Sequence, residues 1–329
     1  MIIFKGNNLS KVYLEMLEYA DRTEISLSRS RVGSVKDLGP AYCELYGDDL
    51  RLVFLNERAI NPFFALAEYS WIISGSKDLR PLQYFIRDFI KYSDDEITLN
   101  GAYGYRLRKY NGIDQIEESI KLLSADPFSR RVVLTIWSNN DLGAQSNDLP
   151  CNTALYLKIR DNKLDVTVLN RSNDLFMGVP YNIFTFYLLQ VYISMRLGLK
   201  VGIQRHYIDS LHLYEKHFKK VSDILKANNK SNIGNIFTDF INYDITRFLN
   251  INHKDIIDLK FNNIHDETIA AMFKSYQIYK NDNNFIDAVA LLPYNLLGFI
   301  AYQWYRKKKE FSEGAKNVKY ENIISMMKS

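Results

Sequence analysis

Cys151 is the residue in this chain that is best suited to covalent chemistry. A thiol attacks as the thiolate, and a fixed cation nearby favours that ionised form. Two short alternating runs, residues 154–159 and 164–169, follow Cys151 and are joined by the polar turn 160–163. This pattern predicts a β-hairpin, which brings Arg171 at the end of the second run back toward the cysteine. The alternative interpretation is a small buried hydrophobe, which is what most free cysteines are.

Glu68 is a candidate general acid or base, because it lies in a strongly apolar segment. Residues 62–74 are predicted to form a helix that Gly75 can end, and the neighbours of Glu68 within it are mostly hydrophobic. Burial in such surroundings raises the pKa of a carboxyl group toward neutrality, where it can both give and accept a proton. The alternative interpretation is a glutamate at the rim of the helix that faces water.

Further elements must position these residues. The hydrophobic pattern predicts a helix at 9–20, strand-like segments up to Leu55, a helix at 113–124 and a strand at 132–137. The stretch 288–305 carries no formal charge, which raises the question of a membrane span. Pro293 and the polar residues around it favour instead a buried pair of helices that is broken near the proline.

The composition is that of a soluble enzyme with one large domain, or a domain and an appendage. The chain has 329 residues, 47% of them hydrophobic and 24% charged, with a net charge of +4. This charge is too small and too dispersed to predict nucleic-acid binding. The lysines after Arg306 are only a weak candidate for an RNA-binding surface. Two cysteines, Cys43 and Cys151, and no N-terminal signal region favour a cytoplasmic protein. We expect no metal site.

A longer pattern surrounds the cysteine. Pro150-Cys151 is followed by the hairpin and then by Arg-Ser-x-Asp-x-x-x-Gly-x-Pro-x-Asn at residues 171–182. This pattern resembles the thymidylate synthase and pyrimidine hydroxymethylase family, and the resemblance runs from about residue 31 to 217. It implies an α/β fold with a large mixed sheet packed by helices, and a homodimer formed sheet against sheet. We expect a catalytic domain at 1–250 and a helical extension without family resemblance at 251–329.

The resemblance implies a covalent mechanism. The Cys151 thiolate would add to C6 of a pyrimidine nucleotide, and C5 would then attack the methylene of 5,10-methylenetetrahydrofolate. Glu68, in a Glu-x-x-Trp-x-x-x-Gly segment, would organise the proton transfers together with Asn182. Tyr103, in a Tyr-Gly turn, would assist loss of the C5 proton, and Arg171 would help to position the ring.

The resemblance also implies that the substrate is a nucleoside monophosphate. Two arginines from each subunit of the homodimer would surround its phosphate: Arg31 and Arg171 from one, and Arg130 and Arg131 from the other. The amide of Asn182 would pair with the O4 and N3–H edge of uracil, whereas an aspartate would suit cytosine better. The remaining predicted substrate contacts are Ser172, Asp174, and the pair that would hold the sugar 3′-hydroxyl, His212 and Tyr214.

The implied cofactor is 5,10-methylenetetrahydrofolate. Asp174 would face its pterin ring, with Gly178 allowing a close approach and Tyr181 beside it. The other predicted cofactor contacts are two aromatic residues and a basic residue near the folate tail, Phe89, Tyr92 and Arg58.

Several departures from the family bear on the fate of the product. Exclusion of water lets hydride from tetrahydrofolate form a methyl group, whereas water gives hydroxymethyl. Asn152 replaces the histidine that usually follows the cysteine, Ser210 replaces an aspartate, and Phe89 and Tyr92 replace tryptophans. We find no Pro-His-Pro segment and no apolar carboxyl-terminal tail. We expect methylation of deoxyuridylate first, because Asn182 retains the uracil-type edge. The alternatives are hydroxymethylation of dUMP, dCMP or CMP, and an inactive nucleotide-binding paralogue.

Overall fold

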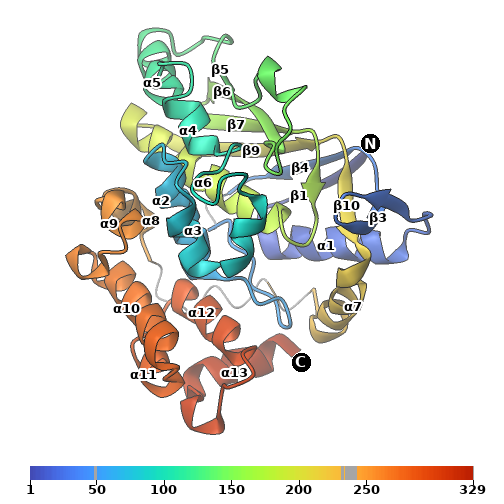
Figure 1. Cartoon of the computed structure of the whole chain (residues 1–329), viewed down its shortest axis with the longest axis vertical. Helices are drawn as coiled ribbons and strands as arrows, with labels where there is room; N and C mark the ends of the chain where they lie inside the picture. The colour runs from blue at the N-terminus through green and yellow to red at the C-terminus, as the bar shows by residue number, and fades with distance from the viewer. Residues whose placement is uncertain (48–49, 231–232, 234–242, 329) are drawn as a thin grey trace.

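The fold is built around a six-stranded mixed sheet. A computed structural model describes residues 1–47, 50–230, 233 and 243–328. The strands lie in the order β1-β4-β9-β7-β6-β5 (Figure 1). Their bounds are β1 Ile2–Gly6, β4 Ala41–Leu45, β5 Val133–Thr135, β6 Asn152–Arg160, β7 Lys163–Asn170 and β9 Lys200–Ile208. The pairs β1 with β4 and β7 with β9 are parallel and the others antiparallel, which confirms the expected mixed sheet.

Alternation of side chains gives this sheet one buried and one exposed face. One row across the sheet is fully buried: Phe4, Cys43, His206, Val168, Leu155 and Leu134. Helix α1 (Leu9–Arg22) covers this face, because Tyr19 packs edge-on against Phe4 at 6.1 Å. The other face leaves four large apolar side chains exposed, those of Ile3, Val133, Tyr156 and Tyr207.

The hairpin of β6 and β7 forms as the sequence predicts. Asp161 and Asn162 occupy its turn with φ angles of 49° and 57°. Positive φ at both central residues is typical of the tight turn that fits the twist of two antiparallel strands. The strand predicted at 132–137 is shorter, since regular pairing covers Val133–Thr135.

A smaller sheet lies beside the end of the hairpin. Its order is β2-β3-β10-β8, with bounds β2 Ser28–Ser30, β3 Gly33–Asp37, β8 Asn173–Asp174 and β10 Leu211–Tyr214. Strand β8 begins three residues after β7 ends. The second sheet therefore brings the turn between β2 and β3 close to the segment that follows the hairpin.

The predicted helices form within two residues of their expected bounds. The helices of the first part of the chain are α1, α2 Pro62–Ile73, α3 Leu79–Phe85, α4 Tyr103–Arg108, α5 Gln115–Ala125, α6 Val179–Leu197 and α7 Phe218–Ala227. Gly75 follows α2 with a φ of 61°, a left-handed conformation that suits a glycine at a helix end.

The last part of the described chain is helical. Its helices are α8 Ile245–Leu249, α9 His253–Ile257, α10 Glu267–Asp282, α11 Phe285–Ala290, α12 Leu296–Arg306 and α13 Val318–Lys328. Pro293 lies between α11 and α12, so the predicted break near this proline is confirmed. Among the described residues, no helix combines the length and apolar character needed to cross a membrane.

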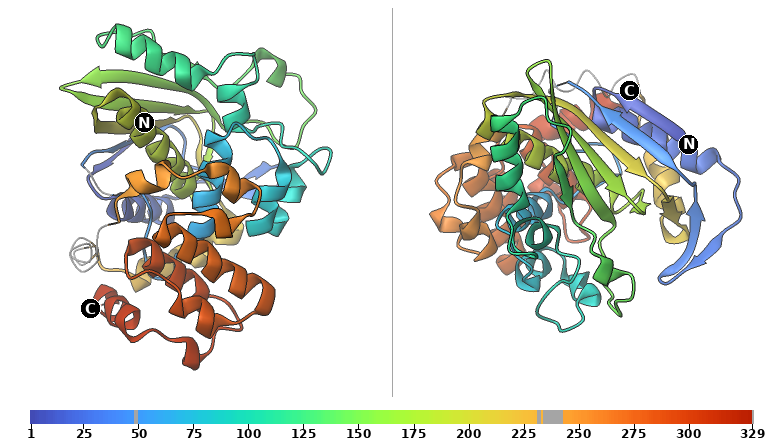
Figure 2. Two further views of the ribbon diagram at one scale, coloured as in Figure 1. Left: turned by 90° about the vertical axis from the view of Figure 1, so that its left-hand side faces the viewer. Right: turned by 90° about the horizontal axis from the view of Figure 1, so that it is seen from above.

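These C-terminal helices pack mainly on α2, at the end of the molecule away from the larger sheet (Figure 2). Phe63 of α2 contacts the rings of Tyr276, Tyr305 and Trp304, with centroids 4.9, 5.6 and 5.7 Å away. All residues of α2 except Glu68 are buried. The apolar composition of this helix therefore reflects burial on several sides.

Candidate active site

Cys151 lies just before β6, half-buried, with Arg171 beside it as the hairpin predicts. The backbone N–H of Arg171 donates to the Cys151 carbonyl at 3.0 Å. The Arg171 Nη2 atom lies 3.7 Å from Cys151 Sγ. The same guanidinium donates to the carbonyls of Leu149 at 3.1 Å and Pro150 at 3.0 Å. The cation is therefore fixed by the backbone of the segment that carries the thiol.

The pKa of the Cys151 thiol is nevertheless raised above its usual value. Burial is the largest cause, Arg171 lowers the pKa, and the carboxylates of Asp148 and Asp174 raise it again. Arg171 thus lowers the pKa of the thiol, as predicted. The effect of burial is larger, because burial penalises the anionic thiolate. The thiol is mainly protonated at neutral pH, so the sulfur must lose its proton as it attacks.

Arg31 approaches the same segment from the turn between β2 and β3. Its guanidinium donates to the carbonyls of Asn147 at 2.8 Å and Ser146 at 3.5 Å. Its charge also lowers the pKa of the Cys151 thiol. Arg31 and Arg171 thus place two guanidiniums on the loop that leads to the nucleophile, in an arrangement suited to an anion.

Arg130 and Arg131 precede β5, and both are exposed. Within the described part of the chain, no hydrogen bond or ion pair joins either side chain to Arg31, Arg171 or Cys151. A single chain therefore brings two of the four arginines to the loop beside Cys151, and the phosphate-binding role of all four stays a prediction.

Glu68 is the residue of α2 that stays partly accessible. The hydroxyl of Thr185 on α6 donates to its Oε2 atom at 3.2 Å. Burial raises the pKa of Glu68 to about 7, and the Thr185 hydrogen bond lowers it slightly against that trend. A carboxyl group with this pKa can donate and accept protons at neutral pH, which is the property that the apolar segment predicts.

Tyr103 begins α4 and lies near Cys151 and Glu68. Its ring stacks on Phe186 of α6 at 6.1 Å. Burial raises the pKa of the Tyr103 hydroxyl, and the nearby Cys151 and Glu68 raise it further. The next residue, Gly104, allows the close contact of α4 with α2, since a Cβ there would lie 2.1 Å from the Ile72 carbonyl oxygen.

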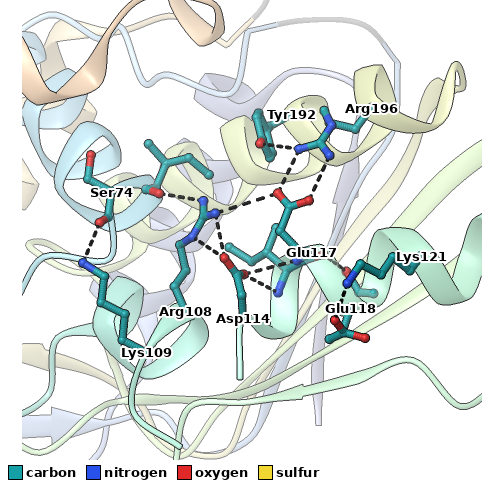
Figure 3. A network of polar contacts seen from close by, with 12 residues as sticks. Ser74, Arg108, Lys109, Asp114, Glu117, Glu118, Lys121, Tyr192 and Arg196 are labelled. Atoms are coloured by element: carbon teal, nitrogen blue, oxygen red, sulfur yellow. Dashed lines mark hydrogen bonds and ion pairs between the residues drawn. The ribbon is translucent and has the colours of Figure 1, made fainter. Parts of the chain in front are cut away.

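A polar network holds α4 and α5 against α2 and α6 (Figure 3). Arg108 donates to Asp114 Oδ2 and to the Ile73 carbonyl, both at 2.7 Å. Glu117 of α5 accepts from Arg196 of α6 at 2.8 Å. These contacts join the ends of the elements that carry Tyr103, Glu68 and Asn182.

The predicted sugar-binding residues lie together on the smaller sheet. His212 is paired with Asp174 across β10 and β8. The Nδ1 atom of His212 lies 3.1 Å from Ser172 Oγ, and the ring of Tyr214 meets the His212 ring edge-on at 5.3 Å. Oδ1 of Asp174 accepts from the two backbone N–H groups of residues 176 and 177 at 2.8 and 3.1 Å.

Two aromatic side chains, those of Phe89 and Tyr92, lie beside Asp174. The rings of Phe89 and Tyr92 pack edge-on at 5.7 Å, and Tyr92 is 47% exposed. Partial burial raises the pKa of Tyr92, with Asp174 as the next cause, so the two side chains are near neighbours. A flat ring beside a carboxylate suits a pterin, which presents an aromatic face and N–H donors.

Three residues predicted to contact the cofactor also have structural partners, and their role toward the cofactor stays a prediction. Arg58 is 5% exposed, and its Nη2 atom donates to the Phe176 carbonyl at 2.5 Å. The hydroxyl of Tyr181 accepts from the backbone N–H of Asn61 at 2.9 Å. A Cβ at Gly178 would lie 2.3 Å from a neighbouring side chain. The structure thus places Arg58 as a buried cation that supports the loop after Asp174.

Other polar residues of the site were not identified from the sequence. Thr185 lies three residues after Asn182, and this helical spacing was the available signal. Asn170 and Asn173 flank the Arg171-Ser172 pair and carried no signal on their own.

Among the described residues, no group of three His, Cys, Asp or Glu side chains is arranged to hold a metal ion.

Comparison with known proteins gives matches of two kinds. The thymidylate synthase family profile matches residues 39–271. The deoxyuridylate hydroxymethyltransferase of Pseudomonas phage M6 is 39% identical over 177 residues, 53% of this chain and 50% of that protein. That of Bacillus phage SP01 is 32% identical over 242 residues, 69% of this chain and 63% of that protein. The thymidylate synthase of Mycoplasma pneumoniae is 32% identical over 136 residues, 41% and 47% of the two chains.

The family profile covers more than half of the chain, and the observed mixed sheet packed by helices agrees with the α/β fold expected of that family. The chain belongs to the thymidylate synthase family. It spans between 47% and 63% of the length of these curated relatives.

Replacement of Glu68 by glutamine should change stability in a pH-dependent way. Burial raises the pKa of Glu68 to about 7, so the folded protein holds a proton that the unfolded chain releases near pH 4.3. The free energy of unfolding of the wild type should therefore fall by up to ~3 kcal/mol as the pH rises from about 5 to about 8. Urea unfolding of both proteins across this range should show Glu68→Gln gaining relative stability with pH.

Glu118→Gln is a matched control, because Glu118 is an exposed residue of α5. Its effect on the free energy of unfolding should stay within ~0.5 kcal/mol at every pH. A pH-independent difference between wild type and Glu68→Gln would contradict the raised pKa.

Proposed function

We propose that this enzyme hydroxymethylates deoxyuridylate at C5, with 5,10-methylenetetrahydrofolate as one-carbon donor and water as the last nucleophile. The observation that carries this proposal is the environment of Asn152. Thymidylate synthesis, the first expectation from the sequence, begins with the same chemistry and is the competing outcome.

Asn152 is a fully buried polar residue next to the nucleophile. Its amide lies close enough to the Tyr103 hydroxyl to lower the pKa of that group. Apart from this contact with Tyr103, neither amide atom has a hydrogen-bond partner within the described part of the chain. A buried carboxamide in this condition is usually completed by ordered water. The environment of Asn152 therefore supports a water site beside Cys151 and Tyr103, where a reactive carbon on C5 would be hydrated.

The relatives support the same choice. The two phage proteins described above carry the name deoxyuridylate hydroxymethyltransferase, and one of them aligns over 69% of this chain. The thymidylate synthase of Mycoplasma pneumoniae aligns over 41%. The two longer alignments, over 177 and 242 residues, are thus with hydroxymethyltransferases, and the one with the thymidylate synthase covers 136 residues.

The first half of the reaction uses the residues around the thiol. Cys151 forms a bond from Sγ to C6 while its thiol proton passes to water, and Arg171 stabilises the sulfur as that proton leaves. Glu68 gives a proton to O4 of the pyrimidine, and Asn182 holds the same edge. When bound, 5,10-methylenetetrahydrofolate supplies the one-carbon unit at the oxidation level of formaldehyde. Asp174 and Tyr92 would hold its pterin ring.

C5 would bond to the one-carbon unit, and the O4 and C5 protons would pass to water, with Tyr103 assisting loss of the C5 proton. The bond from the one-carbon unit to the folate nitrogen would then break, and the second half converts the exocyclic methylene left on C5 into the product. The oxygen of water bonds to the methylene carbon, and the water proton passes to the Glu68 carboxylate. The electrons of the exocyclic double bond move into C5–C6, and the Cys151 sulfur leaves C6 as thiolate. Carbon is neither oxidised nor reduced in this step, so tetrahydrofolate is released unchanged in oxidation state.

Both cysteines are free thiols, which suits a reducing cytoplasm.

We also propose that the enzyme is a homodimer that pairs the exposed faces of two larger sheets. This face exposes Ile3 by 56%, Val133 by 49%, Tyr207 by 42% and Tyr156 by 36%. Tyrosines among aliphatic side chains are typical of interface cores. The exposed Arg130 and Arg131 would then complete the phosphate site of the other subunit.

Product analysis tests the proposed reaction. Deoxyuridylate and 5,10-methylenetetrahydrofolate should give 5-hydroxymethyldeoxyuridylate and tetrahydrofolate, measured by liquid chromatography and mass spectrometry. Cys151→Ala should give no product yet bind deoxyuridylate, since the arginines hold the phosphate. Thymidylate with dihydrofolate would refute hydroxymethylation, and turnover by Cys151→Ala would refute the thiolate mechanism.

Asn152→Ala should separate hydration from the earlier steps. With deoxyuridylate tritiated at C5, released tritium reports proton loss, and hydroxymethyl product reports addition of water. The ratio of product to released tritium should fall at least ~10-fold, because a group that positions the water is lost. Asn140→Ala, at an exposed site, should leave the ratio unchanged. A parallel fall of both readouts in Asn152→Ala would argue against a water-positioning role.

Mixed dimers test the shared phosphate site. Cys151→Ala and the double variant Arg130→Ala, Arg131→Ala should each have little activity. After subunit exchange, the hybrid has one complete site, with the cysteine from one chain and the arginines from the other. Random mixing should restore about a quarter of wild-type activity. No recovery, with hybrid dimers detected by native mass spectrometry, would place the arginines at their own subunit's site or outside it.

A further inference from the structure

Three asparagine side chains form a hydrogen-bonded relay that ends in the site. Nδ2 of Asn170 donates to the backbone carbonyls of Tyr207 at 3.1 Å and Val168 at 3.4 Å. Nδ2 of Asn173 donates to Asn170 Oδ1 at 3.3 Å, and Nδ2 of Asn182 donates to Asn173 Oδ1 at 3.1 Å. Asn170 and Asn173 are 4% and 2% exposed. The relay therefore runs through the protein interior.

The direction of this relay is set by the backbone. A carbonyl oxygen can only accept, so Asn170 must turn its NH₂ group toward Tyr207 and its Oδ1 toward Asn173. Asn173 must then donate to Asn170 and present its own oxygen to Asn182. Turning any one carboxamide over would set two acceptors or two donors against each other. The orientation of the Asn182 amide thus follows from the hydrogen-bond pattern and does not depend on an arbitrary choice.

Backbone packing keeps the middle of the relay in place. The N–H of Asn173 donates to the Ser210 carbonyl at 2.9 Å. A Cβ at Gly178 would lie 2.3 Å from Asn173 Oδ1, so glycine leaves the space that this oxygen occupies. The φ angle of Gly178 is −86°, which any residue can adopt, so space is the reason for this glycine.

We infer that the relay locks the Asn182 carboxamide in one orientation and that Asn170 and Asn173 thereby select uracil over cytosine. This inference rests on the proposed function in one respect, that the pyrimidine edge faces Asn182. It does not depend on whether the product carries a methyl or a hydroxymethyl group.

The chemistry of the two bases explains the selection. The Nδ2 group of Asn182 has two hydrogens, one of which is used by Asn173, and its Oδ1 is left to accept. Uracil offers O4 as acceptor and N3–H as donor, and these match the second Nδ2 hydrogen and Oδ1. Cytosine offers a donor and an acceptor in the reverse order, so it would match only a carboxamide turned over. Thr185, one turn later on α6, donates to Glu68, which places Asn182 on the side of the proposed proton donor.

Nucleotide binding without cofactor tests the relay. The dissociation constants of deoxyuridylate and deoxycytidylate are measured by calorimetry for the wild type, Asn173→Ala and Gly178→Ala. Asn173→Ala removes the acceptor, and Gly178→Ala displaces it while keeping the asparagine. The preference for deoxyuridylate should fall at least ~10-fold in both variants, because the freed amide can turn to suit either base. Gln190→Met is the control, since Gln190 is a buried amide of α6 that bonds to the Leu164 carbonyl.

The ratio of the two dissociation constants separates this role from a structural one. Equal weakening of both nucleotides, or an unchanged ratio in both variants, would overturn the inference. A fall of the ratio in Gln190→Met as large as in Asn173→Ala would overturn it too, because general loosening of α6 would then suffice. A wild-type preference for deoxycytidylate would refute the uracil assignment of the proposed function. Loss of that preference in the variants would still support the relay.

Discussion

The close packing of α4 on α2 is the constraint on which the arrangement of the site depends. A Cβ at Gly104 would lie 2.1 Å from the carbonyl oxygen of Ile72, so the two backbones touch only because this residue is glycine. Tyr103 precedes that contact and comes near both Cys151 and Glu68, which raise its pKa. The nucleophile, the carboxyl group and the phenol therefore meet because two helices approach without side chains between them. The network around Arg108 then prevents α4 from sliding along α2.

Burial where these helices meet favours the neutral form of each acid. It raises the pKa of Cys151 and holds that of Glu68 at about 7. Arg171 opposes this trend at the sulfur, but in the proposed complex the same guanidinium would also bind a phosphate dianion. Two further arginines from a second subunit would share that charge, so Arg171 would keep enough positive potential to stabilise the departing thiolate. A dimer would in this way contribute to the reactivity of the thiol as well as to substrate affinity.

The sequence predicts those parts of the structure that depend on local patterns. The hairpin that joins Cys151 to Arg171 follows from alternation and a polar turn, and α2 follows from its apolar run and Gly75. The environment of Arg58 could not be predicted, because its burial depends on residues far along the chain, such as Phe176. The net pKa of Cys151 is a balance of burial against charge, which needs coordinates. The relay through Asn173 also escaped prediction, since a lone asparagine in a motif does not show which groups it meets.

The packing of the C-terminal helices bears on how Glu68 keeps its raised pKa. Phe63 and Tyr69, on either side of Glu68 along α2, contact aromatic side chains of these helices, and Ser70 lies 3.0 Å from His253 Nδ1. At the far end, Tyr320 of α13 donates to the Pro293 carbonyl at 2.7 Å, so α13 packs on its own neighbours. These helices cover the outer side of α2. Without that cover, water would reach α2 from a second side, the burial that raises the Glu68 pKa would weaken, and the carboxyl group would ionise more readily at neutral pH. The C-terminal helices that cover α2 thus act on the chemistry through the surroundings of one helix.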